Sequence, residues 1–137
     1  MNTPENNKEI VKNFATSVFV NHDLSTLDKY MRDDYIQHNA DVPQGMEGFT
    51  QFFIATFKAI PDFRYDFKQF IAGDDLVAVY STCSGTHTGG EWLGQAATGN
   101  RLDFDVVDIF RVENGMIAEH WDVADTLNLF RQIGSIE

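Results

Sequence analysis

Hydrophobic residues recur at helical spacing through the first half of the chain. Thr3-Pro4 is typical of a helix start, because a hydroxyl group caps the first turn and proline lacks an N–H that this turn does not use. Asp23 can cap a short second helix, and the stripe from Phe49 to Ile60 predicts a third, which ends before Pro61. The stretch 34–39 between them is less regular. The first stripe consists of Ile10, Val11, Phe14, Ala15 and Val18.

From residue 65 onward the hydrophobic period changes to two, which is typical of β-strands. Asn114-Gly115 is a hairpin signal, and Asp125 and Gly134 can cap the two ends of a last helix. Between residues 88 and 100 four glycines accompany Trp92 and Leu93, which indicates a loop or flap with apolar side chains. We predict strands over residues 65–71, 76–87, 101–113 and 116–123.

Helices followed by an antiparallel meander are typical of the α+β class. The predicted strands are long for a chain of 137 residues, which favours a twisted, curved sheet wrapped around the helices. At this length folding buries roughly two-thirds of the surface of the chain, so one core with a pocket can form. We therefore expect one domain over residues 1–137, a cone of curved sheet closed by N-terminal helices.

The charge balance restricts the partners. The net charge is −11, from 10 basic and 21 acidic residues, so nucleic acids and anionic membranes are disfavoured. The N-terminus is polar, and no apolar run reaches the ~20 residues that span a bilayer, so we expect a soluble, cytoplasmic protein. Cys83 is the single cysteine, which excludes an intramolecular disulfide and favours a buried, inert thiol.

One acidic residue interrupts an otherwise apolar strand face. Asp108 shares its parity with Leu102, Phe104, Val106, Phe110 and Val112. A carboxylate at this position loses solvation unless it is paired or hydrogen-bonded, and burial prepares it to take and return a proton near neutral pH. The pattern alone is equally compatible with a core aspartate whose hydrogen bonds are satisfied internally.

Three histidines are further candidates. His38 can act as an acid, a base or an oxyanion donor, or it is a surface histidine between Gln37 and Asn39. His87 lies at the start of the glycine-rich loop, where a pocket rim or an ordinary exposed loop position are the alternatives. His120 and Asp122 share one parity of the last strand. A catalytic zinc site needs about three protein ligands and this pair supplies two, so we expect His120 and Asp122 to form hydrogen bonds and to bind no metal.

Four stretches of the sequence together resemble the SnoaL-like polyketide cyclases, a branch of the NTF2-like superfamily. They are "DYIQHN", "FFIATFKAIPDFRYDFKQFIAGDDLVAVYSTCSGTHTG", "WLGQAATGNRLDF" and "VVDIFRVENGMIAEHWDVADTLNLFRQIG". The resemblance covers nearly the whole chain and implies a conical sheet with helices across its mouth. It also implies a homodimer formed through the sheet.

The resemblance further implies an intramolecular aldol closure of a polyketide ester without a metal or organic cofactor. It gives Asp108 the part of general acid/base and places His38 near the pocket, with His87 and Trp92 at the entrance. We expect the pocket to be lined by Tyr35, Phe53, His87, Trp92, Phe104, Val106, Phe110, His120 and Trp121.

Three functions remain open on the sequence alone. The first is a cofactor-independent enzyme in which Asp108 removes a proton next to a carbonyl of a small hydrophobic ligand while a neighbour such as His38 stabilises the enolate. The second is a non-catalytic protein that binds the same kind of ligand. The third is a dimeric scaffold whose pocket is filled by its own side chains.

Overall fold

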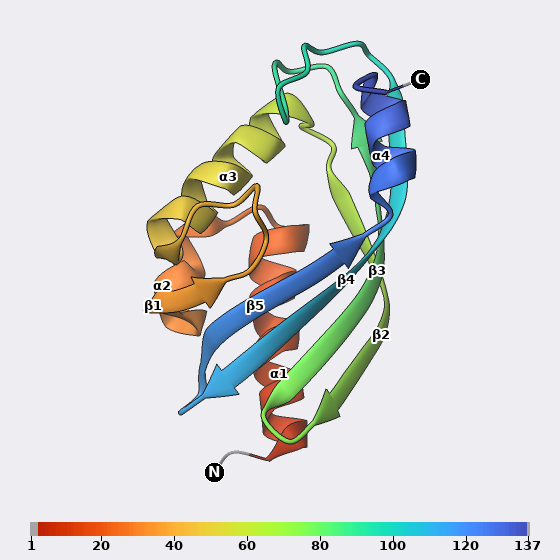
Figure 1. Cartoon of the computed structure of the whole chain (residues 1–137). Coiled ribbons are helices and arrows are strands. Elements are labelled where there is room, and N and C mark those ends of the chain that lie inside the picture. Colours follow the sequence, from red (N-terminus) through yellow and green to blue (C-terminus); the bar gives the residue numbers. More distant parts are fainter. Residues whose placement is uncertain (1–2, 137) are drawn as a thin grey trace.

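One mixed five-stranded sheet organises the chain, in the order β1-β5-β4-β3-β2 (Figure 1). The computed structural model describes residues 3–136. β1 runs parallel to β5, and the other neighbouring strands are antiparallel. The strands are β1 (Met31–Gln37), β2 (Arg64–Gly73), β3 (Leu76–Thr86), β4 (Arg101–Glu113) and β5 (Met116–Ala124).

The two longest helices lie on one side of the sheet, and the last helix lies beside the end of β4 (Figure 1). Local signals that the sequence predicts are present at their ends: the Thr3 hydroxyl accepts a hydrogen bond from the Asn6 N–H (3.1 Å), and Gly134 ends the last helix with φ 91°. The α+β class and the curved sheet with helices across one face are confirmed. The helices are α1 (Pro4–Ala15), the π-helical turn η1 (Thr16–Val20), the 3₁₀ turn η2 (Leu24–Thr26), α2 (Leu27–Tyr30), α3 (Gly45–Ala59) and α4 (Thr126–Ile133).

The region after the first helix differs from the prediction. The second helix ends at Tyr30, and Met31 already begins β1, so the irregular stretch belongs to a strand. β1 pairs with β5 almost the whole length of the chain away, and the expected antiparallel meander therefore has one parallel edge. Local spacing did not reveal this strand because the polar Gln37 is buried along it while the apolar Ile36 is exposed, which reverses the usual alternation.

A β-bulge changes the register between β4 and β5. Asn114 and Gly115 form the turn with φ 51° and 80°, the left-handed pair that a type I′ hairpin requires. Val112 lies opposite Ile117, but Arg111 lies opposite Glu119, so Ala118 is the extra residue of the bulge. Because side chains alternate along a strand, this one residue decides which side chains of β5 point towards the helices.

Two hydrophobic clusters fill the space between sheet and helices. The first lies under α1 and the first turns of α3, where Phe14 contacts Phe49 and Phe110 with ring centroids 6.1 and 5.4 Å apart. The second lies at the α4 end and includes Phe63, Trp92 and Leu129. The inner face of β4 contributes to both clusters, so one strand joins the two halves of the interior.

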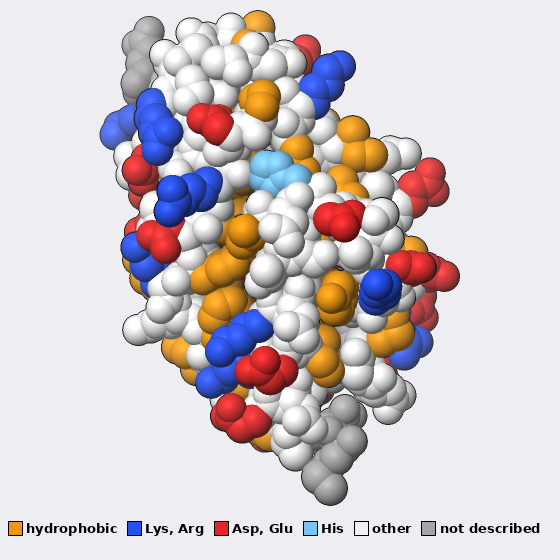
Figure 2. All heavy atoms as spheres, turned by 180° about the vertical axis from the view of Figure 1, so that it is seen from behind, with side chains coloured by type: hydrophobic (Ala, Val, Ile, Leu, Met, Phe, Trp, Pro, Cys, Tyr) orange, Lys and Arg blue, Asp and Glu red, His pale blue; other side chains and the backbone are white. Residues whose placement is uncertain are grey.

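Charged side chains of both signs are interspersed on the reverse side of the molecule, with narrow hydrophobic strips between them (Figure 2). None of the helices in the described part of the chain has the length and apolar character that a membrane crossing demands.

Candidate active site

A cavity of about 410 Å³ lies beside Asp108, within the size range of small-molecule sites. Its walls come from the inner face of the sheet, from α3 and α4, and from the loops that follow β1 and β3. Most of the lining is aromatic or aliphatic, and the polar side chains gather around Asp108. The presence of this cavity disfavours a scaffold whose pocket is filled by its own side chains. The aromatic wall consists of Phe52, Phe53, Phe63, Tyr65, Trp92, Phe104 and Phe130.

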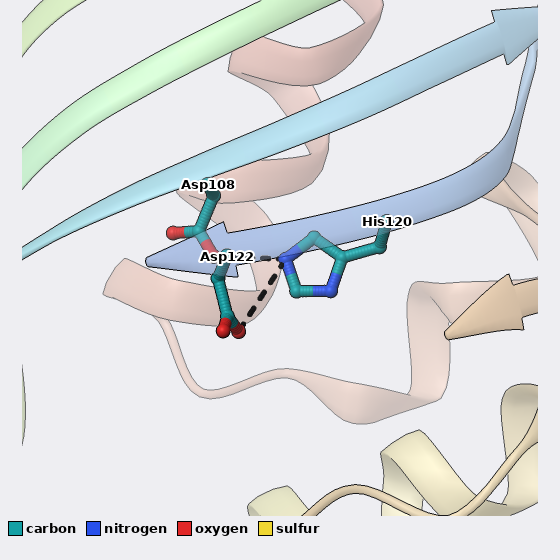
Figure 3. Close-up of side chains that lie close together, drawn as sticks. All are labelled: Asp108, His120 and Asp122. Carbon is teal, nitrogen blue, oxygen red and sulfur yellow. Dashed lines mark hydrogen bonds and ion pairs between the residues drawn. The ribbon is translucent and has the colours of Figure 1, made fainter. Parts of the chain in front are cut away.

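Asp108 and His120 form a buried hydrogen-bonded pair. His120 Nε2 lies 2.8 Å from Asp108 Oδ1, and both residues are only 4% exposed. Asp108 Oδ2 is buried and has no hydrogen-bond partner among the described residues. Asp122 Oδ2 lies 3.9 Å from His120 Nε2, so the histidine nitrogen points at two carboxylates (Figure 3).

The register of the hairpin brings these residues together. Asp108 lies directly opposite Asp122, and His120 lies opposite Phe110, whose ring stacks on the imidazole at 4.7 Å and 22°. Two ionised carboxylates placed opposite each other repel, so a proton or a positive group is needed between them. His120 occupies the place where that group is required.

The end of β1 supplies amide groups that hold the cluster. Gln37 Oε1 accepts from His120 Nδ1 at 2.9 Å, and the side-chain amide of Asn39 donates to both oxygens of Asp122 at 3.0 and 2.9 Å. The parallel pairing of β1 with β5 sets Gln37 opposite His120. The strand that the sequence did not predict therefore carries the groups that orient His120 and Asp122.

Burial shifts the acid–base properties of the groups around the cavity. It raises the pKa of Asp122, and nearby Asp108 adds to that rise, while the Asn39 amide and His120 oppose it. Burial also raises the pKa of Tyr65 and of its neighbour Cys83 well above their ordinary values. A neutral, buried Cys83 has little reactivity, and a protonated Asp122 can donate a hydrogen bond.

His38 lies at the rim of the cavity, away from the acid pair. Its Nε2 lies 2.6 Å from Glu119 Oε2, and its ring stacks on Trp121 with centroids 4.8 Å apart. The side chain is 40% exposed. The structure thus brings His120, and not His38, against Asp108.

The other predicted pocket residues divide into two groups. Phe53, Trp92, Phe104, Val106 and His120 line the cavity, as Asp108 and His38 do, whereas Tyr35, His87, Phe110 and Trp121 are not among its lining residues.

Each of the four residues outside the lining has another place. Tyr35 is packed in the first cluster, and Phe110 is fully buried beneath α1. Trp121 points to the other face of β5 from His120. His87 is buried at the base of the loop, where its Nε2 donates to the Gly90 carbonyl at 2.6 Å.

Asp122, Gln37 and Asn39 were not among the predicted site residues, although all three border the cavity. A signal for Asp122 was present, because it shares the parity of His120 on β5. That signal could not be used, since both faces of the strand mix apolar and polar residues. Gln37 and Asn39 had no comparable signal before the β1 pairing was known.

The cluster also has the donor set of a metal site. One atom from each of Asp108, His120 and Asp122 lies within 4.8 Å of the others. The sequence indicated only two ligands, His120 and Asp122, and the neighbouring strand adds a third. Imidazole with two carboxylates suits a transition metal. The hydrogen bond between His120 and Asp108, however, would have to break before a metal ion could bind between them.

A curved mixed sheet with helices across one face and an acid cluster in an apolar cavity is the arrangement of the NTF2-like α+β fold. The sequence matches the SnoaL-like polyketide cyclase family over residues 9–133. The chain therefore belongs to the SnoaL-like polyketide cyclase family, as the resemblance of its motifs indicated.

Solved structures of similar proteins support this assignment. TsrD from Streptomyces laurentii is 26% identical, with a TM-score of 0.87 over 99% of this chain and 100% of that one. AclR, a candidate hydroxylase from Streptomyces galilaeus, is 26% identical, with a TM-score of 0.84 over 98% and 100% of the two chains. IdmH, a candidate polyketide cyclase from Streptomyces antibioticus, is 26% identical, with a TM-score of 0.75 over 93% and 98%. No curated protein matches the sequence.

Proposed function

We propose that the protein is a cofactor-independent enzyme that removes a proton from the carbon next to a carbonyl group of a small apolar substrate and closes a ring by an aldol-type step. The buried Asp108–His120 pair at an apolar cavity carries this proposal. The family description and the description of IdmH as a candidate polyketide cyclase support a ring-closing reaction. AclR, which has a similar fold, is described as a candidate hydroxylase and so is linked to other chemistry.

Asp108 is the base in this mechanism. No side chain or backbone group within residues 3–136 hydrogen-bonds to its Oδ2, so a lone pair is available for the substrate proton. The substrate C–H bond breaks, the proton passes to Oδ2, and the electron pair moves onto the carbonyl oxygen as an enolate. His120 stays bonded to Oδ1 and holds the carboxylate in place.

Asp122 stabilises the enolate. Because burial raises its pKa, Asp122 holds a proton more readily than an exposed aspartate and can donate a hydrogen bond to the enolate oxygen. The enolate carbon then attacks a second carbonyl carbon of the same molecule, and a C–C bond forms. The second carbonyl oxygen becomes a hydroxyl when it takes back the proton from Asp108.

Exchange of the substrate proton for deuterium tests the first step without knowledge of the natural substrate. An aromatic 1,3-dicarbonyl methyl ester is incubated with the protein in D₂O, and loss of the α-proton signal is followed by NMR. The wild-type protein is expected to accelerate exchange, and Asp108→Asn to lower the catalysed rate by about 10²- to 10⁴-fold, the usual contribution of a general base.

Asp105→Asn is the matched control, because Asp105 is an exposed aspartate of the same strand on the opposite face. It should exchange at the wild-type rate. Undiminished exchange in Asp108→Asn would contradict the proposed mechanism. A probe that binds the wild-type protein tightly but never exchanges would instead favour the alternative function, a non-catalytic ligand-binding protein.

We infer that two copies of the chain pair through the outer face of the sheet. Tyr80, Val107 and Val123 are register neighbours on three adjacent strands, and Ile109 lies opposite Trp121 beside them. Val123 is 71% exposed, which leaves an apolar side chain of this face in water. Val123→Glu should convert a dimer into a monomer in sedimentation analysis; unchanged sedimentation would contradict this interface.

A further inference from the structure

The side-chain amide of Gln37 has one orientation that its neighbours allow. The backbone N–H of Asn39 donates to Oε1 at 3.0 Å, and Nε2 lies 3.1 Å from the hydroxyl of Tyr35. Turning the amide over would set its NH₂ group against the N–H of Asn39, and two donors cannot share a hydrogen bond. The amide oxygen therefore faces His120 Nδ1, and this nitrogen must carry a proton.

The protonated Nδ1 has a consequence at the other ring nitrogen. A neutral imidazole with its proton on Nδ1 has only a lone pair on Nε2, which lies 2.8 Å from Asp108 Oδ1. A hydrogen bond between Nε2 and an ionised carboxylate is then impossible unless one more proton is present. In the opposite tautomer Nε2–H would donate to the carboxylate, and no further proton would be needed.

We propose that Gln37 is a positioning residue that sets the proton content of the active site. By holding the proton on Nδ1 of His120, its amide oxygen makes the His120–Asp108 pair carry one additional proton. The pair is then neutral overall, as imidazolium with an ionised Asp108, the form in which Asp108 can accept the substrate proton. Without Gln37 the same pair would be singly negative.

The surroundings keep both groups from turning. The side chain of Gln44 binds the backbone of Gln37 at both ends, with its Oε1 3.0 Å from the Gln37 N–H and its Nε2 2.6 Å from the Gln37 carbonyl. The ring of Phe110 stacks on His120 and fixes the imidazole plane. Gln37 is 3% exposed, so water does not compete for its oxygen.

The neutral pair matters for the reaction that we propose above. When Asp108 takes the substrate proton, a pair that was neutral becomes singly positive beside the enolate, whereas a pair that was singly negative becomes only neutral. The positive pair attracts the negative charge of the enolate in a buried site of low dielectric constant. The kinetic consequence thus rests on the proposed function, whereas the tautomer of His120 follows from the hydrogen bonds alone.

Nitrogen-15 NMR of the histidine rings tests the tautomer directly. In the wild-type protein His120 Nδ1 should show the shift and one-bond coupling of an N–H at neutral pH. Gln37→Leu removes the acceptor, and the Nδ1 signal should move towards that of an unprotonated nitrogen. Gln37→Glu keeps an acceptor and should keep the N–H signature. Gln51→Leu, at an exposed glutamine of α3, is the matched control and should leave His120 unchanged.

The deuterium exchange assay supplies the second measurement. Gln37→Leu should lower kcat for exchange by about 10-fold or more with a smaller change in KM. Gln37→Glu should not restore kcat, because its carboxylate supplies the acceptor for Nδ1 but also adds a negative charge to the cluster. Circular dichroism of each variant checks folding; if Gln37→Leu does not fold, the wild-type and Gln37→Glu spectra still decide the tautomer.

Two results would overturn the inference: an unprotonated Nδ1 in the wild-type protein, or an unchanged His120 signature in folded Gln37→Leu. A protein that shows the expected signatures but exchanges no substrate proton would refute the proposed function and leave the tautomer inference standing.

Discussion

The inner face of β4 passes through two regions that differ in how they are filled. Phe110 and Val112 lie under α1 and are at most 1% exposed, in a cluster of interlocking aromatic rings. Phe104 and Val106 come from the same face of the same strand, yet they line the cavity and each remains 7% exposed. Asp108 stands between the two pairs, at the border between the packed core and the cavity.

The difference shows that hydrophobic alternation identifies an inner face but not what that face contacts. The same residue types pack against a helix in one half and enclose a cavity in the other. An acid at the border has apolar walls around it and a route to a ligand, whereas an acid deeper under α1 would have no access to one. We expect substitutions in the two regions to separate stability from ligand binding.

Phe14→Ala should have the largest effect on stability, because Phe14 is fully buried and contacts four other aromatic rings, those of Phe19, Tyr30, Phe49 and Phe110. We expect a loss of about 3–5 kcal/mol in the free energy of unfolding, measured by urea denaturation. A loss below about 1 kcal/mol would mean that this half of the interior is as loosely filled as the cavity half.

Phe104→Ala should cost less stability, about 1–2 kcal/mol, because one side of the ring already faces empty space and fewer packing contacts are lost. Binding of an apolar probe, followed by fluorescence titration, should weaken instead. Equal destabilisation by Phe14→Ala and Phe104→Ala would remove the distinction between the two regions.

Leu93→Asn tests the mouth of the cavity. Leu93 lines the cavity with φ 50°, between Trp92 and Gln95, whose backbones pair at 2.9 Å in both directions. Leucine is strained in this left-handed conformation and asparagine tolerates it, so the variant should be more stable by about 0.5–1 kcal/mol. Thermal unfolding measures that gain, and probe affinity should fall because the apolar cap is lost. Lower stability would show that packing of Leu93 outweighs its backbone strain.

Substitution of Glu119 should have the smallest effect on the free energy of unfolding, and this effect depends on pH. Arg111 donates to Glu119 at 2.8 Å and His38 contacts its other oxygen, and these hydrogen bonds lower the pKa of Glu119 in the folded state. A carboxyl group whose pKa is lower in the folded state than in the unfolded state stabilises the protein at pH values above its unfolded-state pKa. This stabilisation disappears as the pH falls through the folded-state pKa.

Glu119→Gln should therefore be less stable than the wild type near about pH 6 and nearly equal to it near about pH 3. Denaturation at both pH values measures the difference. A difference that stays constant over this range would assign the effect to packing and not to charge.

Much of this arrangement could be predicted from local patterns. The alternation along β4 placed Asp108 inward, Asn114-Gly115 marked the hairpin, and the caps at Thr3 and Gly134 marked helix ends. These features depend on residues near one another in sequence. The resemblance to the family predicted the fold class for the same reason, since its motifs keep their order along the chain.

The remainder depended on contacts that local patterns do not contain. Gln37 and Asn39 reach the cluster only because β1 pairs with β5, more than 80 residues later in the chain. The family resemblance placed His38 near the pocket as a candidate neighbour of Asp108, but the ring of His38 stacks outward on Trp121. Which side chains of β5 point inward depended on a shift of one residue in its pairing with β4. Hydrophobic periodicity does not specify such a shift.

The β-bulge at Ala118 has a consequence for how such a pocket can change. If β5 paired with β4 without the bulge, so that Ala118 lay opposite Arg111, Trp121 would come to lie opposite Asp108, and both His120 and Asp122 would turn to the outside of the sheet. An acid-lined cavity would become an aromatic one with an isolated carboxylate. In a hairpin of this kind, a slip of one residue in the strand pairing is enough to exchange a reactive pocket for one that can only bind, while every strand of the fold survives.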